Sequence, residues 1–132
     1  MINTDNKTDN HGLLFADLTY KIRGCAFTVF NTLGFGHKEL VYQKALVKEF
    51  GQKQIPFERE VALNVKYGQT IVGNYRPDFI VNNQVIIELK ALEYLPKSSE
   101  QQILHYLKTT GFRLGLLINF GSPKLYIKRL IW

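Results

Sequence analysis

The chain has 132 residues, a length that suits one compact domain and is short for two. Hydrophobic residues make up 45% and aromatic residues 13%, which is enough to build a buried core. The formal net charge of +6 favours polyanionic partners, above all nucleic acid. A single cysteine, Cys25, excludes an intramolecular disulfide and a cysteine-based metal cluster.

The sequence carries no signal that directs a protein to a membrane. No apolar run is long enough to cross a bilayer, and the polar start lacks the features of a signal peptide. We therefore expect a cytoplasmic protein with no membrane partner. Residues 1–12 are expected to be a flexible tail, and residues 13–132 a single domain.

Two helices are predicted in the first half of the chain. Residues 17–33 place apolar side chains at helical spacing, with Asp17 as N-cap and a glycine-rich break directly after the helix. Cys25 lies in this apolar pattern, so a buried, inert thiol is expected. A second helix is predicted over residues 38–50, closed by Gly51.

From Val61 onward, the spacing of the apolar residues changes from helical to alternating. Strands are predicted over residues 61–67, 70–81 and 85–91, with a turn at Gly68-Gln69 and a loop within residues 82–84. These three strands are expected to form a meander.

A third helix is predicted after Pro96, with Ser98 as N-cap and Gly111 as terminator. Two further strands follow, over residues 114–120 and 125–131. A helix that joins the third strand to the fourth implies a parallel pair within a mixed sheet. The predicted fold is therefore α/β or α+β, with a central five-stranded mixed sheet flanked by helices.

Two charged residues lie within an apolar run over residues 86–92, where Glu88 and Lys90 are two positions apart. Alternate residues of a strand share a face, so both side chains project from the same side. Asp78 lies ten residues earlier, on the preceding strand. A two-residue turn would send Asp78 and Glu88 to opposite faces, whereas a three-residue loop through Gln84, or a bulge, pairs them directly. We expect the shared face, because Pro77 cannot donate to a ladder and favours local irregularity.

Two adjacent carboxylates repel one another unless a cation joins them. Hard oxygen ligands favour Mg²⁺ or Mn²⁺, which can polarise a phosphoryl oxygen and lower the pKa of a bound water. Lys90 would orient that water or stabilise charge on the phosphate. Asp78, Glu88 and Lys90 therefore suit phosphodiester hydrolysis. An ordinary Glu88–Lys90 ion pair on a half-exposed strand is the alternative that the pattern leaves open.

Two helical pairs extend this candidate site. Glu39 and Tyr42 are three residues apart, and Gln102 and Tyr106 are four apart, so each pair shares a helix face. Glu39 would supply a third carboxylate that binds metal through water, and the amide and phenol would contact a phosphate or a base. The alternative is that each pair is an ordinary surface or core-edge pair, with Tyr106 serving only in packing.

In combination, these motifs resemble the PD-(D/E)xK nuclease superfamily, and the Q-x-x-x-Y element resembles its RecB-type branch. More closely, GHKELVY, IPFERE, VIIELKALE and LGLLINFG are similar to segments of the GxxExxY family of small bacterial and archaeal proteins. The likeness runs from Leu18 to the end of the chain. It implies a restriction-endonuclease-like core with a metal site at one edge of the sheet.

The resemblance also implies roles for individual residues. Asp78 and Glu88 would be metal ligands, the backbone carbonyl of Leu89 a third, and Lys90 the catalytic lysine. Glu39 would be the accessory acid on the early helix. Gln102 and Tyr106 would be the supporting pair of the RecB-type branch.

The expected function is a metal-dependent phosphodiesterase that hydrolyses DNA or RNA through a water activated by Mg²⁺ or Mn²⁺. One alternative is a catalytically silent module with a nuclease fold that binds nucleic acid or a protein partner. A phosphoesterase for a small nucleotide is a third reading, and it predicts an enclosed pocket around the carboxylates. By analogy with small nuclease cores, a homodimer or a targeting partner is also expected.

Overall fold

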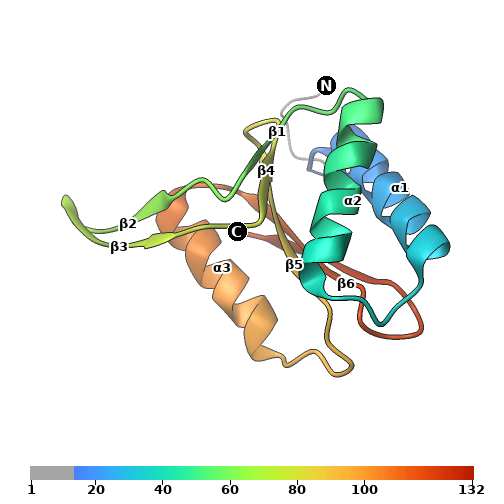
Figure 1. The fold of residues 1–132 in the computed structure, drawn as a ribbon. Helices are drawn as coiled ribbons and strands as arrows, with labels where there is room; N and C mark the ends of the chain where they lie inside the picture. Colours follow the sequence, from blue (N-terminus) through green and yellow to red (C-terminus); the bar gives the residue numbers. More distant parts are fainter. Residues whose placement is uncertain (1–13) are drawn as a thin grey trace.

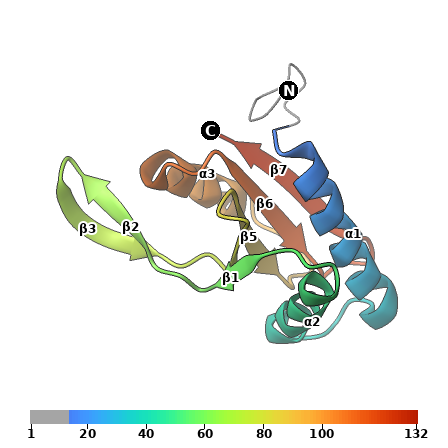
Figure 2. The same cartoon turned by 90° about the horizontal axis from the view of Figure 1, so that it is seen from above.

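A computed structural model describes residues 14–132, so the tail expected at residues 1–12 lies outside the described residues. A five-stranded sheet lies between two helices on one face and one helix on the other (Figures 1 and 2). None of these helices is long and apolar enough to cross a membrane, within residues 14–132. The elements are α1 Ala16–Leu33, α2 Glu39–Gln52, β1 Phe57–Arg59, β2 Leu63–Tyr67, β3 Thr70–Tyr75, β4 Phe79–Val81, β5 Val85–Lys90, α3 Ser98–Thr110, β6 Leu114–Asn119 and β7 Tyr126–Ile131.

The sheet has the mixed topology that the sequence predicts. Its strand order is β1-β4-β5-β6-β7, with β5 and β6 parallel and the other pairs antiparallel. Helix α3 makes the crossover between the two parallel strands. All six residues of β6 are buried, as expected for a strand with both faces covered.

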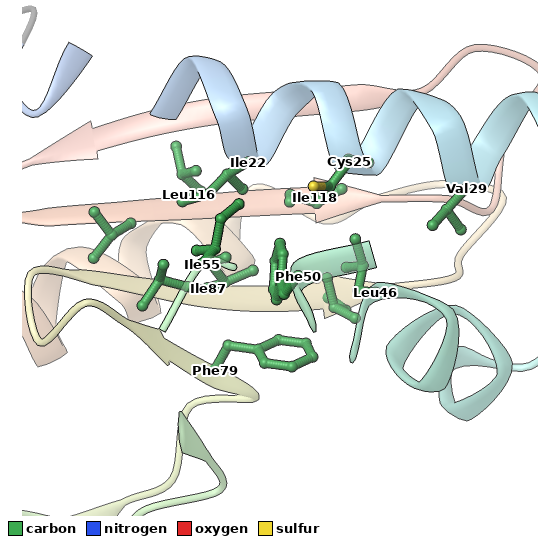
Figure 3. Packing of buried hydrophobic residues seen from close by; sticks show 14 of the residues in the cluster. Ile22, Cys25, Val29, Leu46, Phe50, Ile55, Phe79, Ile87, Leu116 and Ile118 are labelled. Atoms are coloured by element: carbon green, nitrogen blue, oxygen red, sulfur yellow. The ribbon is translucent and has the colours of Figure 1, made fainter. Parts of the chain in front are cut away.

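The larger core cluster lies between the sheet and helices α1 and α2. Figure 3 shows Ile22, Cys25 and Val29 of α1 facing strand residues that include Leu116 and Ile118. Cys25 is buried as expected, and burial raises the pKa of its thiol, which disfavours the reactive thiolate.

The opposite face of the sheet packs against α3. Ile86 of β5 and Leu117 of β6 form a second cluster there with Ile103 and Leu107 of the helix. Side chains alternate along a strand, so Glu88 lies on the same face as Ile86, two residues earlier. The charged end of β5 therefore projects on the side that α3 covers.

The predicted meander is wrong in its first two strands. The strand expected over residues 70–81 is split at Arg76-Pro77-Asp78 into β3 and β4, because Pro77 offers no N–H to a ladder. Strands β2 and β3 pair only with each other and form a hairpin that extends away from the main sheet (Figure 1). The edge position next to β4 belongs to β1, a strand of three residues that the sequence analysis did not predict.

Both predicted N-caps are also displaced. Helix α1 starts one residue before Asp17, which lies in the first turn, and the N-cap is Phe15 with φ 56°. Helix α3 starts at Ser98 itself, and its N-cap is Lys97. The predicted N-cap Asp17 lies two residues after the N-cap of α1, and the predicted N-cap Ser98 lies one residue after that of α3. Neither N-cap residue makes a side-chain capping hydrogen bond.

The helix ends follow the predicted glycines more closely. Gly111 caps α3 in the left-handed region with φ 88°, as predicted. Gly34 ends α1 with φ 69°, where its N–H donates to Phe30 O. Helix α2 continues one residue past Gly51 and ends at Gln52.

Candidate active site

The loop between β4 and β5 decides whether the two carboxylates meet. Its three residues lie between Val81 and Val85, which pair with one another. Asn82 and Asn83 adopt positive φ values of 52° and 54°, which asparagine tolerates better than most residues. Continuing the β4–β5 register by one residue places Asp78 opposite Glu88. The expected shared face of Asp78 and Glu88 is confirmed, and a three-residue loop produces it.

Hydrogen bonds tie Asp78 and Glu88 to each other's strands. The Asp78 N–H donates to Glu88 Oε1 at 3.0 Å, and the Leu89 N–H donates to Asp78 Oδ2 at 2.7 Å. Each carboxylate is therefore oriented by a backbone group of the neighbouring strand. Such charge-assisted bonds are stronger than neutral ones and fix the two side chains side by side.

Burial dominates the electrostatics of this pair. Burial raises the pKa of Glu88 to about 7, and the negative charge of Asp78 adds to the rise. Burial also raises the pKa of Asp78, while the Leu89 N–H and the charge of Lys90 oppose the rise. Two carboxylates are thus held together where solvent stabilises them poorly, the situation that a cation would relieve.

Lys90 and Glu39 complete the cluster. Lys90 ends β5 and is half-buried, and its charge acts to lower the pKa of Asp78, Glu88 and Glu39. Glu39 is the first residue of α2, where the helix N-terminus favours a carboxylate. Burial raises the pKa of Glu39, and Asp78 raises it further. The charge of Lys90 therefore acts on three carboxylates, not on Glu88 alone.

Gln102 and Tyr106 lie together on α3 and line a surface cavity of about 490 Å³. Tyr106 is half-buried and stacks on Tyr75, with ring centroids 3.7 Å apart and planes 1° from parallel. Burial raises the pKa of the Tyr75 phenol, and the negative charge of Glu88 raises it further. Tyr106 therefore packs against a tyrosine whose phenol lies within the electrostatic influence of Glu88.

Tyr42 has a structural role that its spacing from Glu39 does not reveal. Its hydroxyl donates to Gly34 O at 2.6 Å and accepts from the His37 N–H at 3.2 Å. Its ring is fully buried and stacks on Phe120 at 4.5 Å. These contacts hold the loop between α1 and α2, and thereby fix where α2 begins with Glu39.

Sequence reasoning missed three residues that contact or neighbour the pair of acids. Gln43 Nε2 donates to Asp78 Oδ1 at 3.1 Å, and Arg59 Nη2 donates to Gln43 Oε1 at 2.6 Å. Gln43 could have been found, since it is four residues after Glu39 and shares its helix face. Arg59 and Tyr75 gave no comparable signal, because their places depend on β1 and on the hairpin.

The residues present fit a divalent cation of the Mg²⁺ type. Within residues 14–132, no three His, Cys, Asp or Glu side chains come together in a way that could hold a metal ion. The candidate donors are instead two adjoining carboxylates and backbone oxygen. Mg²⁺ keeps several waters and is usually held by only one or two carboxylates together with substrate phosphates. The accessory role of Glu39 stays a prediction.

The chain was compared with known proteins at the level of structure and of sequence. Among solved structures, the fold is similar to the crystal structure of SSO0001, with a TM-score of 0.49, 15% sequence identity, and coverage of 86% of this chain and 74% of that one. No curated protein matches the sequence significantly. The family model of the PD-(D/E)XK nuclease superfamily matches residues 16–130, nearly the whole chain. The chain belongs to the PD-(D/E)XK nuclease superfamily.

Proposed function

We propose that this protein is a metal-dependent nuclease that hydrolyses phosphodiester bonds of DNA or RNA. The observation that carries the proposal is the crosswise hydrogen bonding of Asp78 and Glu88 beside Lys90. Membership of the nuclease superfamily supports it. A purely structural ion pair would not need a second half-buried carboxylate, whose charge next to Glu88 is unfavourable.

Asp78 and Glu88 would hold Mg²⁺ or Mn²⁺, with the Leu89 carbonyl as a further donor. When bound, such a cation supplies Lewis acidity toward a phosphoryl oxygen and lowers the pKa of a coordinated water. The protein's part is to orient both acids and to limit the rise in the pKa of Asp78 that burial causes. The Leu89 N–H and Lys90 serve this purpose, because each stabilises the charged form of Asp78.

Lys90 would orient the attacking water and stabilise negative charge that develops on the phosphate. Its position at the end of β5, beside both carboxylates, supports this role. Glu39 would act as the accessory acid, and Gln102 with Tyr106 would contact the substrate from α3. The net charge of +6 favours a nucleic-acid substrate over a neutral one.

Two finer expectations belong to the same proposal. Gly36, Glu39 and Tyr42 carry the spacing of the GxxExxY family, which would be the subfamily of this chain. A homodimer or a targeting partner would supply specificity.

A cleavage assay with a matched lysine pair tests the proposal. Wild type, Lys90→Met and Lys124→Met would be incubated with labelled single-stranded DNA, double-stranded DNA and RNA, in Mg²⁺, Mn²⁺ or EDTA. Wild type and Lys124→Met should cleave at least one polymer when Mg²⁺ or Mn²⁺ is present, and none in EDTA. Lys90→Met should lose at least 100-fold in rate, because Lys124 lies in the β6–β7 turn and Lys90 beside the acids.

The remaining outcomes separate the alternatives. Equal cleavage by Lys90→Met and wild type would overturn the role of Lys90. Absence of cleavage, combined with tight binding of nucleic acid, would replace the nuclease with a silent binding module.

A further inference from the structure

We propose that Gln43 and Arg59 form a positioning relay that holds the Asp78 carboxylate in the orientation required for binding a divalent cation. The inference rests on the proposed function and adds two residues to it. Gln43 lies on α2 and is 4% exposed, whereas Arg59 is exposed at the end of β1. The relay therefore runs from the surface, through a buried amide, to a candidate metal ligand.

The chemistry of the three groups allows one arrangement of the amide. A guanidinium can only donate hydrogen bonds, and an ionised carboxylate can only accept them. The Gln43 amide joins them by accepting from Arg59 at 2.6 Å and donating to Asp78 Oδ1 at 3.1 Å. If the amide were flipped, its NH₂ group would face the Arg59 donor and its oxygen would face the Asp78 acceptor, so neither hydrogen bond could form. Arg59 thus fixes which end of the amide faces Asp78.

The relay complements the backbone contact on the other carboxylate oxygen. Asp78 Oδ2 accepts from the Leu89 N–H at 2.7 Å, so each oxygen of Asp78 receives one donor. A carboxylate held at both oxygens cannot rotate, yet each oxygen keeps a lone pair for a further partner. Hydrogen-bonded partners of this kind orient metal ligands and change metal affinity when they are removed.

Arg59 acts on Asp78 mainly through the amide and not through its own charge. Arg59 is exposed, so solvent and salt screen its charge from Asp78. Its short contact is with Gln43. Removing Arg59 should therefore matter only while Gln43 is present.

Calorimetric titration with Mn²⁺ tests this dependence in the full chain. Gln43→Met keeps the size of the side chain but removes both hydrogen bonds, and should weaken binding about 10- to 100-fold. Arg59→Met should weaken it less, by about two- to tenfold. The double variant should bind no more weakly than Gln43→Met alone, because the relay is already broken.

Two controls separate positioning from charge and from stability. Arg76→Met removes an exposed arginine whose side chain donates to the backbone oxygen of Glu60 at 3.4 Å, and metal affinity should stay within twofold of wild type. Thr19→Val alters a residue that is also 4% exposed but lies on α1, and should likewise bind normally. Circular dichroism confirms that each variant is folded.

Specific outcomes would overturn the relay. One is Mn²⁺ affinity of Gln43→Met within twofold of wild type. A second is a double variant whose loss of affinity equals the sum of the two single losses in free energy. A third is a loss of affinity in Arg76→Met as large as that in Arg59→Met. If wild type binds no Mn²⁺, the proposed function fails instead. The relay is then tested by thermal unfolding of the same four proteins, where non-additive losses of Tm support it and additive losses overturn it.

Discussion

Two buried tyrosine hydroxyls near the site differ in their partners. Tyr42 Oη makes two hydrogen bonds, to Gly34 O and from the His37 N–H. Tyr75 Oη is buried and interacts with the Glu88 carboxylate, which raises the pKa of the phenol, but within residues 14–132 the two groups do not reach the geometry of an ordinary hydrogen bond. An unpaired buried hydroxyl costs free energy, so these two residues should respond oppositely to the same change.

Replacement of each tyrosine by phenylalanine tests that difference. Tyr75→Phe should leave the free energy of unfolding unchanged or raise it by up to about 1 kcal/mol, because the lost hydroxyl has no partner. Tyr42→Phe should lower it by about 1–2 kcal/mol. Urea unfolding of metal-free protein measures both values. A loss above about 1 kcal/mol in Tyr75→Phe would show that its hydroxyl is paired.

Glu88 should make the stability of the metal-free protein depend on pH. Its pKa rises from an ordinary 4.5 to about 7, so the folded state binds a proton more tightly than the unfolded state. The free energy of unfolding should therefore fall as pH rises from 4.5 to 7, by on the order of 2–3 kcal/mol. Urea unfolding in EDTA across this range measures the slope.

Glu88→Gln should remove most of that slope, whereas Glu58→Gln, an exposed change on β1, should keep it. Asp78 and Glu39 also have raised pKa values, so a smaller slope of the same sign should remain. An unchanged slope in Glu88→Gln would contradict the assignment of this pH dependence to Glu88.

At the scale of elements, the end of β5 is fixed by a close contact with the segment after β6. The Asn119 side chain accepts from the Leu92 N–H at 3.0 Å and donates to Leu92 O at 2.9 Å. Gly121 lies so near that a Cβ added there would come 2.1 Å from the Leu92 backbone nitrogen. The chain just beyond Lys90 is therefore held by a glycine and an amide.

Two glycine-to-alanine changes should have opposite effects for this reason. Gly121→Ala should lower the free energy of unfolding by about 1–3 kcal/mol, because the Leu92 segment must move. Gly24→Ala lies within α1 and has open space around it, so it should raise stability by about 0.5–1 kcal/mol. Denaturant unfolding measures both. A neutral Gly121→Ala would contradict the close packing of the two segments.

The elements also show what the sequence could predict. Helical spacing in α1 and the buried run of β6 were predicted, because periodicity reports burial directly. The pairing of Asp78 with Glu88 followed from the loop length and from Pro77. The hairpin's place outside the main sheet did not follow, since alternation in β2 predicts a strand and not its partner. Three residues of β1 are too few to show a period.

In the candidate site, too, only the residues that are close in the sequence could be predicted to lie together. Asp78, Glu88 and Lys90 lie on one hairpin, so local spacing brings them together. Gln43 and Arg59 come from α2 and β1, and meet Asp78 only after the whole domain has folded. A hydrogen-bonded chain across three elements has no signature in local spacing.

At the scale of the whole molecule, a chain of net charge +6 holds two acids side by side, and the charge of one of them, Asp78, also acts on Glu39. In EDTA those acids should repel a phosphate backbone that the rest of the surface attracts. Asp78→Asn/Glu88→Gln should therefore bind DNA more tightly than wild type in EDTA, by about threefold or more. Affinity of both proteins should fall at least about tenfold between 50 and 200 mM salt.

Fluorescence anisotropy with labelled DNA measures these affinities. Asp17→Asn/Glu49→Gln removes the same two charges from α1 and α2 and serves as the control. An equal gain in both double variants would show that only net charge matters, and would contradict a nucleic-acid surface centred on the site.

The most direct test of the central claim is a calorimetric titration of Mn²⁺ into wild type and into Asp78→Asn/Glu88→Gln at neutral pH. The two carboxylates are held side by side by the Asp78 and Leu89 N–H groups, which is the basis of the proposed metal site. The account predicts saturable binding in wild type and none in the double variant. Absence of binding in wild type, or equal binding in both proteins, would contradict it.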